Sequence, residues 1–231
     1  MLTRPFDRPA LLSALRARTA RLEGAGRADA GEVELAAGLP GLARAALHEV
    51  VAESPGCGAG FCAILLGRAG GTVIWIGDGG LLAWPPGLAG HGLSPAQLVL
   101  LRADSVTDAL WAVEEALRCA AVGGVLLSLP PDAVLDLSTT RRLHLAAGTG
   151  GALGLLLRSE AAEGSAGTAA VTRWRVAPLG AARGLADPRW EIELLRSRSG
   201  RPAGPWAVTW RAAAGELELD EEGTAALRAM G

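Results

Sequence analysis

Short apolar segments recur along the middle of the chain, and stretches with a helical pattern separate them. The recurrence interval of roughly two dozen residues suits one strand, one helix and two short loops. Near-continuous apolar strands that alternate with helices indicate a mostly parallel sheet covered on both faces. The predicted strands are "ALHEVVA" ending at residue 52, "TVIWI" (72–76), "QLVLLR" (97–102), "GVLLSL" (124–129) and "ALGLLLR" (152–158).

Two of the intervening stretches carry clear helix signals. Residues 105–121 place apolar side chains along one face behind a hydroxyl residue that can cap the helix. Residues 137–150 offer Ser138 or Thr139 as the cap and Gly148 as the end. These patterns predict two helices that pack on the sheet.

The two ends of the chain differ from this middle part. Residues 1–31 predict an N-terminal helix followed by a Gly- and Ala-rich linker, and residues 220–231 predict only a tail. The body is therefore expected over residues 32–219. Its last third alternates polar and apolar residues, which predicts an antiparallel β-meander at the sheet edge, in "VTRWRVAPL", "PRWEIELLRSRSG" and "PWAVTWRAAAGELEL".

Composition narrows the class of protein. The 231 residues are 50% hydrophobic and carry a formal net charge of −2, so overall charge does not indicate a nucleic-acid binder. Three cysteines with no C-x-x-C pair suit free thiols in a reducing compartment, and three distant histidines predict no metal site. No apolar run reaches the roughly 18 residues that span a membrane. We expect a soluble, cytoplasmic protein.

The stretch "AESPGCGAGFC" raises the question of nucleotide chemistry, because glycines between a strand and a helix are typical of a phosphate-binding loop. Gly56, Gly58 and Gly60 offer the backbone N–H groups. However, Ala59 stands where the phosphate-binding lysine belongs, Gly60 replaces the Mg²⁺-binding hydroxyl, and Ser128 replaces the Walker-B carboxylate. The chain contains no lysine at all. We interpret the stretch as a degenerate phosphate loop without ATPase activity; an ordinary tight turn is the alternative.

One other catalytic arrangement is conceivable. Cys57 precedes a predicted helix, whose N-terminus would lower the thiol pKa, and His48 lies on the preceding strand. A Cys/His nucleophile pair is the weaker hypothesis. We expect no cofactor and no catalytic residue.

The C-terminal part is rich in arginine and tryptophan. Arg173, Arg175 and Arg189 are interleaved with Trp174 and Trp190. Basic and aromatic side chains together are typical of surfaces that bind single-stranded nucleic acid or an acidic protein. The alternative is a half-exposed sheet with solvated arginines and core tryptophans.

The strand pattern, the strand–helix turn and the late meander resemble the RecA core. Within that superfamily the chain resembles the ImuA family of damage-inducible mutagenesis proteins. The most specific matching stretches are "DALWAVEEALRC" and the couplet "TRWRV" and "RWEIELLR". The resemblance implies an SOS-response accessory protein in error-prone translesion DNA synthesis. It also implies RecA and ImuB as partners, an error-prone C-family polymerase as an indirect partner, and a RecA-facing role for Arg196 and Arg198.

Two alternatives remain open at this point. The first is an inhibitor resembling SulA, which uses a related domain to block the division protein FtsZ. The arginine-rich meander argues against it, because SulA-like chains end near the last parallel strand. The second is a true RecA-like ATPase in which an arginine replaces the lysine, although the guanidinium fork differs from an ammonium point charge.

Overall fold

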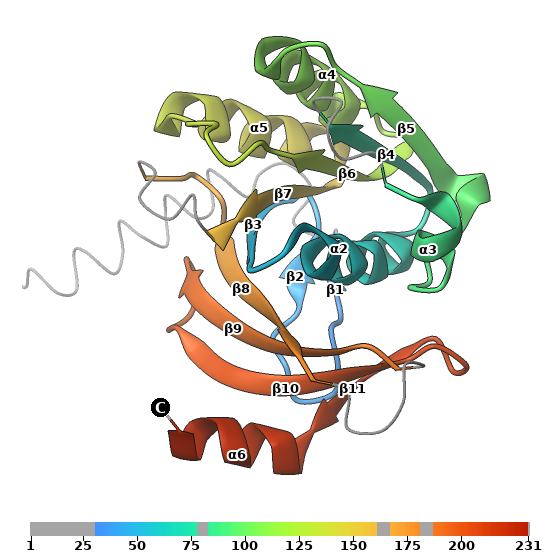
Figure 1. Ribbon diagram of the computed structural model, residues 1–231. Coiled ribbons are helices and arrows are strands. Elements are labelled where there is room, and N and C mark those ends of the chain that lie inside the picture. The colour runs from blue at the N-terminus through green and yellow to red at the C-terminus, as the bar shows by residue number, and fades with distance from the viewer. Residues whose placement is uncertain (1–30, 78–82, 161–166, 181–186, 231) are drawn as a thin grey trace, which may run out of the picture.

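The computed structural model describes residues 31–77, 83–160, 167–180 and 187–230 (Figure 1). The predicted N-terminal helix and most of its linker lie outside these residues. The elements are β1 (Glu32–Val33), β2 (Leu42–Ala43), β3 (Ala46–Ala52), α2 (Pro55–Ala69), β4 (Thr72–Gly77), α3 (Pro85–Ala89), the 3-10 turn η1 (Pro95–Gln97), β5 (Leu98–Arg102), α4 (Val106–Arg118), β6 (Val122–Ser128), α5 (Leu137–Gly150), β7 (Leu153–Ser159), β8 (Thr172–Leu179), β9 (Arg189–Ser197), β10 (Ala203–Arg211), β11 (Glu216–Asp220) and α6 (Glu221–Met230).

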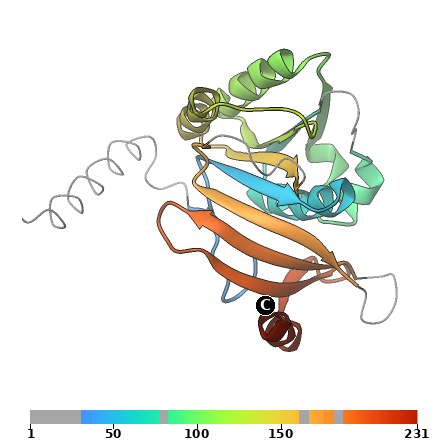
Figure 2. The same cartoon turned by 60° about the vertical axis from the view of Figure 1, so that its left-hand side comes forward.

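The main sheet has nine strands in the order β11-β10-β9-β8-β3-β7-β6-β4-β5. Neighbouring strands pair in parallel within the set β8, β3, β7, β6, β4 and β5. On the other side of β8, strands β9, β10 and β11 follow one another as antiparallel neighbours. This arrangement confirms the predicted α/β fold with a mostly parallel sheet and a C-terminal meander. The predicted meander differs in its first strand, because β8 pairs in parallel with β3 and only its other edge is antiparallel, to β9. Figure 2 shows how the sheet curves from the central strands into β9 and β10.

Helices cover both faces of the parallel strands, as the apolar strand sequences require. Helix α2 packs on β3, β6, β7 and β8 on one face, whereas α4 and α5 pack on the other. The C-terminal strands curl beneath α2 (Figure 1). Trp190 of β9 therefore reaches Phe61 of α2, with their ring centroids 6.4 Å apart.

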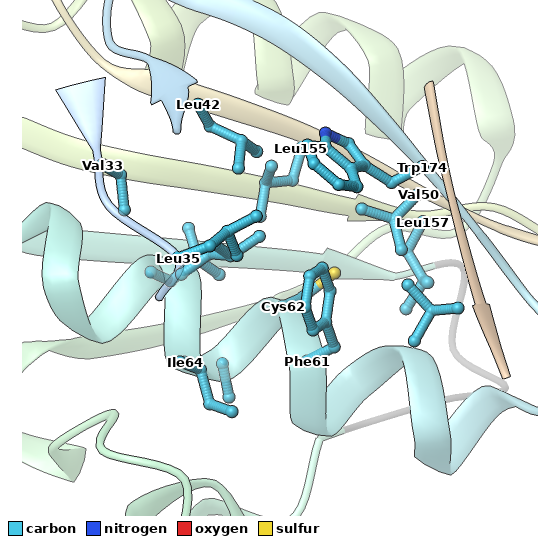
Figure 3. Packing of buried hydrophobic residues seen from close by; sticks show 14 of the residues in the cluster. Val33, Leu35, Leu42, Val50, Phe61, Cys62, Ile64, Leu155, Leu157 and Trp174 are labelled. Carbon is cyan, nitrogen blue, oxygen red and sulfur yellow. The ribbon is translucent and has the colours of Figure 1, made fainter. Parts of the chain in front are cut away.

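Two cores result from this layering. The larger one joins α2 to the sheet and to the C-terminal tryptophans, and Figure 3 shows Phe61 and Cys62 packed near Leu157 and Trp174. The smaller one lies under α4 and α5 and includes Leu117. Burial of apolar surface on both faces is what holds the parallel strands together.

Several sequence predictions need correction at the ends of elements. Helix α5 is capped by Asp136, whose side chain accepts from the Thr139 N–H, and not by Ser138 or Thr139. The helix runs to Gly150 and ends at Gly151, which has a φ of 84°, a conformation that glycine adopts without strain. The cap of α4 at Ser105 agrees with the prediction.

Residues 220–231 were predicted only as a tail, without secondary structure. In the structure, residues 221–230 form helix α6, which packs on β10. The Thr224 hydroxyl accepts from the Ala207 N–H and thereby fixes the helix to that strand. The ordered body of the chain thus extends past residue 219.

Within the described residues, no helix is long and apolar enough to cross a membrane. The same residues contain no group of three or more His, Cys, Asp or Glu side chains arranged to hold a metal ion.

Candidate functional site

A pocket of about 380 Å³ opens at the carboxyl ends of the central parallel strands. In open α/β sheets, ligands bind at this edge. The pocket is bounded by the ends of β3, β6 and β7, by the first turns of α2, and by α3 with the residues that follow it. Its lining residues are Ala52, Pro55, Gly56, Ala59, Gly60, Trp75, Ala83, Trp84, Gly87, Leu88, His91, Ser128, Leu129, Pro131, Leu157, Arg158 and Ser159.

The strand–helix connection beside this pocket is much shorter than a phosphate loop. Strand β3 ends at Ala52 and α2 begins at Pro55, so only two residues connect them. The first helical hydrogen bond already runs from the Gly58 N–H to the Ser54 carbonyl at 3.1 Å. Gly56, Gly58, Ala59 and Gly60 therefore lie in the first turns of the helix and not in an extended loop. The interpretation of these residues as a degenerate phosphate loop without ATPase activity stays a prediction.

Close packing explains one of these glycines directly. A Cβ atom on Gly58 would lie 2.5 Å from Leu157 Cδ1 and 2.6 Å from the Ala52 Cβ. Helix α2 can therefore approach the ends of β3 and β7 this closely only with glycine at position 58. Gly56, by contrast, lines the pocket, and a Cβ atom at this position would have no neighbouring atom within 4 Å.

The pocket offers little that would bind a triphosphate. Among the described lining residues, the only cationic side chain is Arg158, and it is engaged elsewhere. Its Nη2 donates to the Ala133 carbonyl at 2.9 Å, and its Nη1 lies 3.6 Å from Glu49. No carboxylate is among the described lining residues. Ser128, at the Walker-B position, ends β6, and it also lines the pocket. Asp78, the carboxylate that follows β4 in the sequence and the one offered there for activating water, lies outside the described residues.

The hypothesis of a Cys57/His48 nucleophile pair is wrong. His48 is buried and bonds Thr172 Oγ1 through Nδ1 at 2.7 Å and the Ala43 carbonyl through Nε2 at 2.8 Å. Burial lowers the pKa of His48 to about 4 and raises the pKa of Cys57 to about 12. Burial outweighs any effect of the helix N-terminus, so Cys57 stays a thiol at neutral pH.

The arginines proposed as DNA contacts all form intramolecular ion pairs. Arg173 Nε donates to Glu49 Oε2 at 2.8 Å, and Arg175 bonds Glu160 at 2.7 Å and Glu191 at 2.9 Å. Arg189 pairs with Asp220. Carboxylates thus neutralise much of the positive charge that phosphate binding would require, and direct DNA binding by these arginines stays a prediction.

The tryptophans of this region are core residues. Trp174, Trp190, Trp206 and Trp210 are all buried in the cluster around α2. Bases stack only on exposed rings. The alternative of core tryptophans on a half-exposed sheet therefore describes these four residues.

The arginine pair at the end of β9 contacts the β7–β8 connection. Arg196 donates to the carbonyls of Thr168 at 3.1 Å and Ala170 at 2.8 Å, and Arg198 donates to the Ala169 carbonyl at 2.6 Å. Both side chains therefore reach the same segment, as their spacing of two predicts. Arg198 is exposed, whereas Arg196 is half-buried. The RecA-facing role that the resemblance implies for this pair stays a prediction.

Sequence reasoning did not find two features of this region. The first is Glu49, a buried carboxylate in the middle of the apolar strand β3; a charge inside such a run is itself a signal for a buried ion pair. The second is His91, which lines the pocket from the segment after α3. No spacing in the sequence relates His91 to α2.

The strand order, with the pocket at the carboxyl edge beside α2, belongs to a RecA-like fold. The fold is similar to that of the RadB recombinase in its crystal structure, with a TM-score of 0.57, 12% identity, and coverage of 78% of this chain and 92% of that one. At this identity the likeness establishes the fold alone.

The amino-acid sequence is similar to that of known relatives. The chain is 34% identical over 153 residues to Protein ImuA of Caulobacter vibrioides, in the strains NA1000 / CB15N and ATCC 19089 / CIP 103742 / CB 15. The match covers 61% of this chain and 61% of each curated relative. It confirms the resemblance to the ImuA family that the sequence motifs indicate. No protein-family model matches the chain.

Proposed function

We propose that this chain is a non-catalytic, RecA-like accessory protein of SOS-induced, error-prone translesion DNA synthesis. The observation that carries the non-catalytic part is the turn between β3 and α2. With two connecting residues and glycines placed inside the helix, it is shorter than the loop whose backbone N–H groups surround phosphates in nucleotide-binding proteins, which supports the proposal. The pocket beside it has no free cation among its described residues.

The likeness to Protein ImuA supports the mutagenesis role. A RecA-like fold without phosphate chemistry still presents a large, specific surface to other proteins, which is what an accessory protein needs. In this proposal the chain acts as an adaptor that links RecA to ImuB and, through ImuB, to the error-prone C-family polymerase. Direct binding of single-stranded DNA by the chain stays a prediction.

The proposal of a SulA-like inhibitor is less well supported. Beyond the last parallel strand β8, this chain adds three further strands and helix α6. The buried tryptophans of β9 and β10 make these strands part of the main core. A chain whose core depends on them differs from the shorter SulA-like arrangement.

A single binding experiment separates these roles. The purified full chain is immobilised and offered RecA, ImuB and FtsZ in parallel, with and without ATP. The proposal predicts that the immobilised chain retains RecA and ImuB and does not retain FtsZ. It also predicts that neither interaction requires ATP bound to the chain itself. Retention of FtsZ alone would favour the division inhibitor, and retention of none of the three would refute the adaptor role.

A further inference from the structure

We propose that the pocket at the carboxyl edge binds one aromatic side chain of a partner polypeptide, a side chain that carries an N–H or O–H donor as tryptophan and tyrosine do. This inference rests on the proposed adaptor function and specifies how one partner would be held. The pocket thus replaces a nucleotide site with an anchor site for protein.

The walls suit an uncharged aromatic group. The pocket volume of about 380 Å³ lies within the roughly 300–1,000 Å³ range of small-ligand sites. Its surfaces come mainly from apolar residues, among them Ala59, Leu88, Leu129 and Pro131. A planar ring gains most from such walls, because aromatic side chains bury large apolar areas in one piece.

One polar atom of the described lining, the His91 ring nitrogen Nε2, suits a hydrogen-bond donor on the ligand; the lining also carries the hydroxyls of Ser128 and Ser159 and the buried, unpartnered Nε1 of Trp75. The His91 Nδ1 lies 2.9 Å from the Gly87 carbonyl, and a carbonyl only accepts, so Nδ1 carries the hydrogen. In the neutral ring, Nε2 is then an acceptor. Nε2 faces α2, since it would lie 3.0 Å from a Cβ on Gly60, which also lines the pocket. A ligand with one donor satisfies this atom.

The charges in the pocket argue against a nucleoside triphosphate as its ligand. A nucleoside triphosphate carries several negative charges, and the one cationic side chain among the described lining residues, Arg158, is already engaged with Glu49 and the Ala133 carbonyl. A carboxylate-bearing ligand would likewise find no unengaged cation among the described lining residues. The pocket therefore favours an uncharged group over an anionic one.

The mouth of the pocket carries an exposed tryptophan. Trp84 precedes α3, lines the pocket and is 71% exposed. A large apolar side chain left in water beside an apolar pocket is typical of a surface that a protein covers. Tryptophans of this kind, next to a pocket, are the residues that dominate protein–protein affinity. A partner polypeptide accounts for Trp84, whereas a ligand confined to the pocket leaves it exposed.

The test uses N-acetyl-tryptophanamide as the probe for a tryptophan residue in a polypeptide. Its binding to the full chain is followed by NMR through the indole N–H signals and the His91 ring signals. Gly56→Phe fills the pocket from a position where a Cβ meets nothing within 4 Å, and Gly56→Ala at the same position leaves the pocket open. Circular dichroism and the thermal midpoint report whether each variant folds.

We expect saturable binding to wild type and to Gly56→Ala, and at least a tenfold loss in Gly56→Phe. A probe methylated on the indole nitrogen lacks the donor and should bind about 3- to 10-fold more weakly, the range of one hydrogen bond. Adenosine and ATP are the competitors. The proposal is overturned if ATP binds more tightly than the tryptophan probe, if Gly56→Phe binds the probe as well as Gly56→Ala does, or if wild type does not bind it.

The outcome is separable from that of the adaptor role. If RecA and ImuB bind to wild type and to Gly56→Phe equally, the adaptor role stands and the anchor site is refuted. If neither binds to wild type while the probe does, the adaptor role is refuted and the site chemistry stands. Loss of one partner in Gly56→Phe alone, with Gly56→Ala unaffected, supports both.

Discussion

Arg173 lies directly opposite Glu49 in the parallel β3–β8 pair, and its Nε donates to Glu49 Oε2 at 2.8 Å. The other carboxylate oxygen lies 3.6 Å from Arg158 Nη1. Glu49 is only 1% exposed, so this carboxylate joins three strands inside the protein. Strand β8 is also where the C-terminal meander attaches, and the ion pair therefore connects the parallel and antiparallel parts of the sheet.

Replacing Glu49 should destabilise the fold strongly. In Glu49→Ala, the half-buried Arg173 and the buried Arg158 lose their counter-charge, and breaking a buried pair in this way costs about 3–5 kcal/mol. Urea denaturation of both proteins gives the difference in the free energy of unfolding. Glu218→Ala is the matched control, because Glu218 is 48% exposed and water screens its pair with Arg211, so that pair contributes little to stability. Equal effects of the two substitutions would contradict the assigned role of Glu49.

Two glycines two residues apart should respond to alanine in opposite directions. In Gly58→Ala the new methyl group would overlap Leu157 and Ala52, so the helix must shift and the free energy of unfolding should fall by about 1–3 kcal/mol. Gly56→Ala meets open space within a helix and should stabilise by about 0.5–1 kcal/mol. Thermal unfolding of both variants measures the signs. Destabilisation by both would indicate a glycine-dependent loop in place of the helix.

This contrast shows where sequence reasoning stops. The apolar runs predicted five of the six parallel strands to within about two residues, because burial on both faces leaves a signal that depends only on local sequence; β8 was predicted as an antiparallel strand. The glycines of "SPGCGAG" carry no such signal: Gly58 is needed for close packing against Leu157, a residue about one hundred positions away along the chain. Local pattern does not distinguish a glycine that packs from a glycine that binds phosphate.

The candidate site was predictable only in part. Ala59, Gly60 and Ser128 stand at the positions where the residues for nucleotide chemistry are missing, and all three line the pocket. They lie at or after strand ends that meet at one edge of a parallel sheet. His91 and Trp84 reach the pocket through α3, whose place depends on tertiary contacts such as the bond from Trp210 Nε1 to the Gly90 carbonyl. The sequence also did not reveal that carboxylates pair with the arginines, because most of these carboxylates lie far from their arginines along the chain.

Stability should fall in mild acid because of His48. Burial holds the pKa of His48 at about 4, against about 6.5 in the unfolded chain, so the unfolded state takes up a proton first as pH falls. The contribution is fully present above pH 6.5 and is lost as pH falls towards 4, with a slope of up to about 1.4 kcal/mol per pH unit. Urea unfolding at several pH values, with NMR titration of the His48 ring, measures it. A ring that titrates near 6.5 in the folded protein would contradict this prediction.

The arginine pair at β9 is the next test of partner binding. If Arg196 and Arg198 mark the RecA-facing surface, Arg198→Ala should weaken RecA binding, by about 2 kcal/mol or more for a charge-assisted contact, while the fold survives. Arg196→Ala should lower stability as well, because it leaves the Thr168 and Ala170 carbonyls without their donor. Pull-down with RecA, with circular dichroism as the folding control, separates the two effects. Unchanged RecA binding by folded Arg198→Ala would place the surface elsewhere.

The central claim is that this RecA-like fold works without turning over a nucleotide, and phosphate release tests it most directly. The purified chain is incubated with ATP and Mg²⁺, with and without single-stranded DNA, beside RecA as the positive control. The short β3–α2 connection and the engaged Arg158 predict phosphate release no higher than that of buffer under either condition. DNA-stimulated turnover approaching that of RecA would contradict the account.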